Sequence, residues 1–202
     1  MKVEDISFRA IISTASGLLY WGGVYLKAHM ARRSGRSPKT SPSNLKEKTL
    51  WMLWLVVISF WIGLPVISIR ADLSRIGLTT LLFTPPPVFY GSTLIVLGYI
   101  GTLWCYHEMG SSWKIGIDPE GETVLVTTGP YRYVRHPIYL FQMMMLWGVF
   151  LLLPLSGIGI GILIQFISAG IKARDEERFL TNKLGKQYMM YKRKTGMFFP
   201  GL

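Results

Sequence analysis

Cysteine and charge are both scarce in this sequence of 202 residues. The single cysteine, Cys105, excludes an internal disulfide and a cysteine-rich zinc site, and its place in an apolar run favours an inert packing role. Only 16% of the residues are charged, against about 25% in a typical soluble protein. The mean hydropathy is positive, which is unusual for a soluble chain. These features place the protein in the membrane class.

Acidic residues are the scarcer charged type, with 11 Asp and Glu against 22 Lys and Arg. A net charge of +11 is compatible with nucleic-acid binding, but nucleic-acid binders carry their cations on one water-exposed face. Here the cations flank apolar runs, so we expect anionic lipid headgroups as partners and no nucleic acid. The sequence contains no combination of His, Cys and carboxylate residues at metal-ligand spacing, so we expect no metal site.

Apolar runs long enough to cross a bilayer occur along most of the chain. Crossing requires about 20 apolar residues, which three runs supply: roughly 8–28, 49–69 and 87–107. The run 138–172 is too long for one span and is interrupted at 154–157 by proline and glycine, which predicts a tight helical hairpin. We therefore expect an all-α integral membrane protein with five transmembrane helices, the last two forming the hairpin.

Basic residues alternate between the segments that join these runs. Lys and Arg are abundant after the first run, before the fourth run and in the C-terminal tail, so these segments should face the cytoplasm. Apolar residues at helical spacing beyond residue 172 predict a cytoplasmic, amphipathic C-terminal helix. We expect residues 1–85 to form an N-terminal membrane anchor of two spans and an interfacial segment. Residues 86–202 would form a core of three spans, a loop and the tail.

A polar stretch, GPYRYVRHPIY at 129–139, directly precedes the fourth run. Pro137 suits the first turn of a helix, so His136 should lie at a helix N-terminus, where free backbone N–H groups and the helix dipole favour an anion. One interpretation is a site for a carboxylate-bearing ligand. The other is membrane anchoring, with the arginines setting topology and the tyrosines forming an interfacial aromatic belt.

A second polar segment, KARDEERFLTNKLGKQYMMYKR at 172–193, follows the last run. Lys172 and Glu176 are four residues apart and would share a helix face. Asp175, Glu176 and Glu177 form either a solvated turn at the membrane surface or part of a site. They are the only acids in an otherwise basic tail.

Together the two segments resemble the isoprenylcysteine carboxyl methyltransferase family, and the related phospholipid methyltransferases share the general plan. Residues 129–139 match the family pattern G-x-Y-x-x-x-R-H-P-x-Y, and residues 176–191 match E-E-x-x-L-x-x-x-x-G-x-x-Y-x-x-Y. The resemblance covers roughly residues 95–195. It implies a methyltransferase core in 86–202 that binds S-adenosylmethionine in a cytoplasm-facing pocket.

The resemblance also implies roles for individual residues. The cofactor would contact Val124, Leu125, Val126, Tyr131, His136, Pro137, Tyr139 and Glu176. Lys172 and Arg174 would orient an acceptor carboxylate, and Glu177, or alternatively Glu108, would serve as a base for an amine acceptor. Two positions depart from the family pattern, with Lys172 in place of an arginine and Thr123 in place of a histidine.

The acceptor decides how much catalytic machinery is required. A carboxylate is already ionised at neutral pH, whereas an amine must first lose a proton to a base. The cations at 172 and 174 favour the carboxylate of a prenylcysteine-like lipid or protein, and phosphatidylethanolamine N-methylation is the alternative. A sterol-type reductase has a similar C-terminal half but is usually much longer. A non-enzymatic transporter or scaffold would carry polar residues within its spans, and these spans have almost none.

Overall fold

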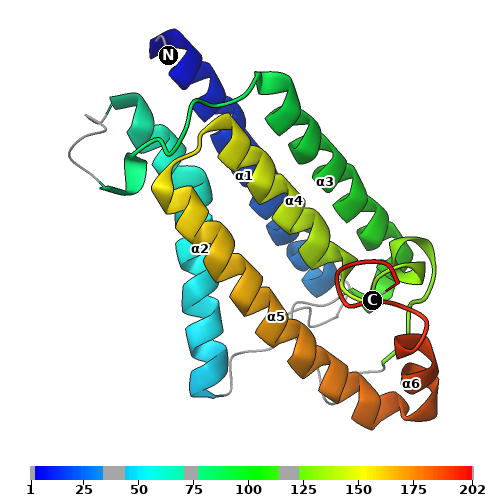
Figure 1. Ribbon diagram of the computed structural model, residues 1–202. Helices are drawn as coiled ribbons and strands as arrows, with labels where there is room; N and C mark the ends of the chain where they lie inside the picture. Colours follow the sequence, from blue (N-terminus) through cyan, green and yellow to red (C-terminus); the bar gives the residue numbers. More distant parts are fainter. Residues whose placement is uncertain (1–2, 34–43, 71–76, 114–122, 202) are drawn as a thin grey trace.

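The computed structural model describes residues 3–33, 44–70, 77–113 and 123–201, which are predominantly helical (Figure 1). Within these ranges, extended pairing is limited to two isolated bridges, Leu81 with Leu155 and Val134 with Gly196. The all-α expectation is confirmed for the described residues. The long helices are α1 (Val3–Arg33), α2 (Leu45–Arg70), α3 (Val88–Met109), α4 (Pro137–Leu152) and α5 (Ser156–Leu184). The short ones are η1 (Gly77–Thr79), η2 (Gly110–Ser112), η3 (Gly129–Arg132) and α6 (Lys186–Lys192).

Three of the described helices, α2, α3 and α5, are long and apolar enough to cross a membrane. Helix α4 is apolar but has only 16 residues. The outward faces of the three helices are apolar as well: Leu55, Ile100 and Phe166 are 58%, 56% and 56% exposed. Soluble monomers rarely present such continuous apolar surface to water. The protein is therefore an integral membrane protein.

Helix α1 is joined to the rest of the bundle by buried polar contacts. The Nε1 atom of Trp61 donates a hydrogen bond to the hydroxyl of Ser16 at 3.0 Å, which connects α2 to α1. Arg9, which is 6% exposed, pairs with Asp5 at 2.9 Å and donates to the backbone carbonyl of Pro86 at 2.9 Å. Because the buried charge is both paired and hydrogen-bonded, its desolvation cost is offset.

Glycine lets α3 and α4 approach closely. A Cβ atom on Gly91 would lie 2.7 Å from the carbonyl oxygen of Gly148, and a Cβ on Gly148 would lie 2.6 Å from the carbonyl oxygen of Gly91. No side chain fits at either position, so the two backbones are in direct contact. This packing fixes α4, and with it His136 at its start, relative to α3.

The connection between α4 and α5 falls in the proline- and glycine-containing segment that interrupts the fourth apolar run. Its backbone is covered by the segment between α2 and α3. Leu82 N–H donates to the carbonyl of Pro154 at 2.9 Å, and Ser156 N–H donates to the carbonyl of Thr80 at 3.0 Å. The hydroxyl of Ser156 donates to the carbonyl of Gly77. These bonds satisfy backbone groups that the helix break leaves open.

Helix α5 extends well beyond its apolar part, which runs from Ser156 to Ile171. From Lys172 onward the helix is rich in charge, and it ends where Gly185 adopts a φ of +52°, in the left-handed region that favours glycine. The chain then forms α6 and returns toward the start of α4 (Figure 1). The amphipathic helix expected from the sequence is therefore divided into the end of α5 and the separate α6.

Candidate active site

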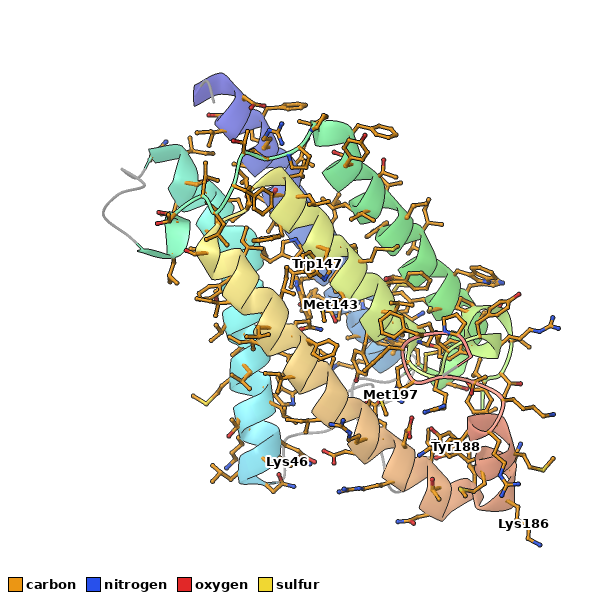
Figure 2. The ribbon with its side chains drawn as sticks, in the orientation of Figure 1. Lys46, Met143, Trp147, Lys186, Tyr188 and Met197 are labelled. Carbon is orange, nitrogen blue, oxygen red and sulfur yellow. The ribbon has the colours of Figure 1, made fainter. Side chains whose placement is uncertain are left out.

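A cavity of about 600 Å³ lies where the ends of the helices converge. Its walls come from α1, α2, the end of α3, the segment before η3, the start of α4, the charged part of α5, and α6. It occupies the end of the bundle marked by Tyr188 in Figure 2. This volume is within the range of small-molecule sites, about 300–1,000 Å³.

The tertiary structure brings most of the site residues expected from the sequence to this one cavity. All the expected cofactor contacts line it: Val124, Leu125, Val126, Tyr131, His136, Pro137, Tyr139 and Glu176. Lys172 lines it too. The exposed Arg174 and the buried Glu177 are not among the described residues that line the cavity. The lining residues come from segments far apart in the sequence, so the cavity exists only in the folded chain.

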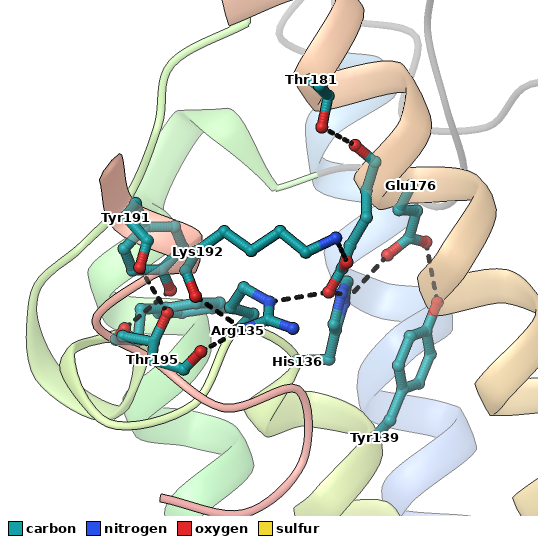
Figure 3. A network of polar contacts seen from close by, with 10 residues as sticks. Arg135, His136, Tyr139, Glu176, Thr181, Tyr191, Lys192 and Thr195 are labelled. Atoms are coloured by element: carbon teal, nitrogen blue, oxygen red, sulfur yellow. Dashed lines mark hydrogen bonds and ion pairs between the residues drawn. The ribbon is translucent and has the colours of Figure 1, made fainter. Parts of the chain in front are cut away.

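His136 lies between two carboxylates, just before α4 begins (Figure 3). Its Nδ1 atom is 3.4 Å from Oε2 of Glu176, and its Nε2 atom is 3.5 Å from Oε1 of Glu177. The hydroxyl of Tyr139 donates to the other oxygen of Glu176 at 2.8 Å. Burial alone would lower the pKa of His136, but the hydrogen bonds and charges of the two carboxylates outweigh it and raise the pKa. The site therefore favours the imidazolium form.

Glu177 is held by cations. Arg135 Nε donates to its Oε1 at 2.7 Å, and Lys192 Nζ lies 2.6 Å from its Oε2. Burial raises the pKa of Glu177, but hydrogen bonds from His136, Lys192 and Arg135 outweigh burial and lower the pKa to about 2. A carboxylate with so low a pKa is a poor proton acceptor. Glu177 therefore connects α5 to α6 and to the segment just before α4.

The C-terminal residues close the site beside His136. Its backbone N–H donates to the carbonyl of Met197 at 3.1 Å, and the N–H of Arg135 donates to the carbonyl of Gly196 at 2.9 Å. The N–H group of His136 is therefore occupied and is not free for an anion. The imidazole ring is the part of this residue that can bind a ligand.

The turn that carries Tyr131 requires glycine at its first position. Gly129 has a φ of +56°, and a Cβ there would lie 2.5 Å from Cγ of Glu108. Glu108 accepts a hydrogen bond from Trp104 Nε1 at 3.1 Å and another from the hydroxyl of Thr128. Glu108, considered from the sequence as an alternative base, thus holds this turn against the end of α3.

Helices α1 and α2 contribute an aromatic wall that no sequence motif indicated. The rings of Trp54 and Tyr139 are 6.1 Å apart, and those of Trp21 and Trp54 are 6.2 Å apart. All three residues line the cavity. The available sequence signal was weak, with one tryptophan in the first run and three in the second. These two helices therefore form part of the cavity wall.

Unpaired polar atoms gather around the same cavity. Among the described residues, Trp21 Nε1, Gln142 Nε2 and Tyr188 Oη are buried without a hydrogen-bond partner, and His136 Nε2 makes only a long contact of 3.5 Å with a carboxylate. Each of these residues lines the cavity. Buried polar groups in native proteins nearly always have partners, so this concentration indicates a space built for a polar ligand. Sequence reasoning did not single out Gln142, although a glutamine within an apolar run was an available signal.

The fold and cavity define a class: an integral membrane protein with a polar ligand site where its helices converge. A comparison of the sequence with known protein families identifies the family within this class. Residues 87–187, half of the chain, match the phospholipid methyltransferase family. The chain belongs to that family.

Individual relatives agree with this assignment. The chain is 36% identical over 115 residues to a protein-S-isoprenylcysteine O-methyltransferase of Saccharomyces cerevisiae, covering 54% of this chain and 47% of the relative. A protein of the same name from Dictyostelium discoideum is 33% identical over 117 residues, covering 55% and 48%. These matches confirm the resemblance to the isoprenylcysteine methyltransferases. The aligned region spans about half the length of both relatives.

A third relative has a different name. The cobalt-zinc-cadmium resistance protein CzcN of Cupriavidus metallidurans is 26% identical over 151 residues, covering 74% of this chain and 63% of the relative. The described residues contain no group of three or more His, Cys, Asp or Glu side chains placed to hold a metal ion.

Proposed function

We propose that the protein is an S-adenosylmethionine-dependent membrane methyltransferase that methylates the carboxylate of a prenylcysteine-like lipid at the cytoplasmic face. One observation carries the proposal: most of the residues that match the two family motifs line a single cavity, although the two motifs are distant in sequence. The named isoprenylcysteine methyltransferase relatives support it.

The polar groups of the cavity fit S-adenosylmethionine, which has an amino-acid end, a ribose and an adenine. The His136 imidazolium would hold the carboxylate, and Glu176 would bind the ammonium or the ribose hydroxyls. The aromatic rings of Tyr131 and Tyr139 would cover the adenine. When bound, the cofactor would supply a methyl group attached to a sulfonium. Transfer would form a C–O bond to an acceptor oxygen and break the C–S bond, and the electron pair of the C–S bond would remain on sulfur.

The charges around the cavity support a carboxylate acceptor over an amine. Lys172 lines the cavity and would attract and orient the acceptor anion. An ionised carboxylate requires positioning in a dry pocket but no base. Both acids considered as bases are engaged elsewhere, since Glu177 pairs with Arg135 and Lys192, and Glu108 holds the turn at Gly129.

For the topology, we propose that α1 and α4 cross the membrane together with α2, α3 and α5. Helix α1 has 31 residues, and α4 packs directly on α3. The alternation of basic segments supports five spans, with the cavity end of the bundle on the cytoplasmic side. In this arrangement residues 1–85 anchor the chain and wall the cavity, and residues 86–202 supply the motifs.

The test is a methylation assay on the purified full chain in detergent. Radiolabelled S-adenosylmethionine is supplied with a farnesylcysteine analogue or with phosphatidylethanolamine vesicles, and cofactor binding is measured by calorimetry. We expect label on the farnesylcysteine analogue. Label found on phosphatidylethanolamine alone would overturn the proposed acceptor, and a protein that does not bind the cofactor would refute the methyltransferase proposal.

A further inference from the structure

We propose that Gln142 recognises the methyl acceptor, with its side-chain amide donating a hydrogen bond to an oxygen of the acceptor carboxylate. This inference rests on the proposed function and adds a specificity-determining residue to it. It is independent of the two sequence motifs, because Gln142 lies outside both.

The position of Gln142 suits an acceptor that arrives from the bilayer. Gln142 follows His136 by six residues on α4, which places it about 9 Å farther along the helix axis at 1.5 Å per residue. It is 2% exposed and lines the cavity. The cavity thus has a charged rim around His136 and Glu176, and a deeper part within the apolar helices. A lipid-anchored headgroup would reach the deeper part first.

One half of the Gln142 amide is already occupied. Gln165 Nε2 on α5 donates to Gln142 Oε1 at 2.9 Å, and both side chains are buried. The remaining group on Gln142 is its NH₂ donor, which has no partner among the described residues. A buried donor without an acceptor is unfavourable, and polar groups within membrane helices are generally functional.

A hydrogen bond between two glutamines can also serve only to hold two membrane helices together. Such a structural role accounts for the hydrogen bond from Gln165 to Gln142 Oε1. It does not account for the unpaired NH₂ group of Gln142 or for the position of Gln142 in the cavity wall. The terminal torsion of a glutamine is soft, so a small rotation presents an N–H to a ligand without moving the helix.

The chemistry of this donor selects among acceptors. The amide NH₂ of Gln142 is a donor, so it can bond to the lone pairs of a carboxylate oxygen. An ammonium group is also only a donor, so it cannot form a hydrogen bond with this NH₂ group. Lys172 lines the same cavity and adds a positive charge for the same anion. Together they favour a carboxylate over the amine of phosphatidylethanolamine.

The experiment compares Gln142→Leu with Gln165→Leu, since both variants lose the same interhelical hydrogen bond and only the first loses the proposed donor. A third variant, Gln142→Glu, keeps an oxygen for Gln165 and replaces the NH₂ group. Each full-length protein in detergent is assayed for its melting temperature, its calorimetric affinity for S-adenosylmethionine, and kcat and KM with a farnesylcysteine analogue.

We expect the two leucine variants to lose similar stability and to keep the cofactor affinity of the wild type. KM for the analogue should rise about tenfold or more in Gln142→Leu and in Gln142→Glu, and by much less in Gln165→Leu. An unchanged KM in both Gln142 variants, or equal KM changes in the two leucine variants, would overturn the assignment. The proposed function fails separately, if the wild type neither binds the cofactor nor methylates the analogue.

Discussion

The Nδ1 atom of His136, at the start of α4, lies 3.4 Å from Oε2 of Glu176, in the charged part of α5. Each residue belongs to a different motif, and both line the same cavity. A cation and an anion side by side complement the amino-acid end of S-adenosylmethionine, which carries one charge of each sign. The pair is the point at which the two motifs become one site.

Replacing Glu176 by Gln should lower the affinity for S-adenosylmethionine about tenfold or more, because the carboxylate that faces the ammonium or ribose is lost. The measurement is calorimetry in detergent. Asp175→Asn is the matched control, since Asp175 pairs with Lys46 at 2.6 Å and is not among the described lining residues. Equal affinities in Glu176→Gln and the wild type would contradict the assigned role.

The raised pKa of His136 predicts a pH dependence. The groups facing the ring are Glu176 and Glu177, and the latter is shared with Arg135 and Lys192. Because the pKa is raised above 6.5, the imidazolium contributes stability fully below 6.5 and loses it as pH rises through the raised value.

We therefore expect the melting temperature of the wild type to fall as pH rises through the raised pKa of His136, and the affinity for the cofactor to fall over the same pH range. His136→Asn should lack the stabilisation that the imidazolium provides. The difference in melting temperature between the wild type and this variant should therefore shrink as pH rises. A difference that stays constant across this pH range would show that the ring does not titrate in this way.

Glu177→Gln should destabilise the docking of α6 and the C-terminal residues by about 3–5 kcal/mol, because it leaves buried Arg135 without its carboxylate. The pKa of Glu177 is lowered from 4.5 to about 2. Its contribution to folding stability is therefore present above pH 4.5 and is lost as the pH falls toward about 2. Thermal melting and limited proteolysis of the C-terminus measure the effect. Arg178→Ala, at an exposed site, is the control. Equal protease resistance of both variants would argue against this connection.

Lys172 and Arg174 should differ in their effect on the acceptor, although both cations were expected from the sequence to orient it. Lys172 lines the cavity, whereas Arg174 is exposed and absent from the described lining. Lys172→Ala should raise the acceptor KM about tenfold, and Arg174→Ala should leave it nearly unchanged. Steady-state kinetics with the farnesylcysteine analogue decide between them. A larger effect at Arg174 would reverse the assignment.

Local patterns predicted several elements well. Long apolar runs marked α2, α3 and α5, and Pro137 marked the start of α4. The break between α4 and α5 contains Pro154, which interrupts helical hydrogen bonding, whereas Gly157 lies inside α5. Most of the site residues expected from the sequence line the cavity, but much of the rest of its lining comes from α1 and α2, which carry no motif.

Other features escaped local patterns. The tail was expected as one helix, but Gly185 divides it from α6, and the return of the chain allows Met197 to occupy the N–H of His136. The aromatic wall from α1 and α2 has no motif. The low pKa of Glu177 depends on Arg135 and Lys192, which reach it from other elements.

By itself the sequence determined that this is a helical membrane protein and roughly where its apolar helices lie. In a bilayer, backbone groups must be satisfied within each segment, so apolar runs have almost no alternative to the helix. Only the tertiary structure decided which polar groups meet: His136 with Glu176, Arg135 with Glu177, and Gln142 with Gln165. These contacts depend on how separate helices pack against one another, which local sequence patterns do not specify.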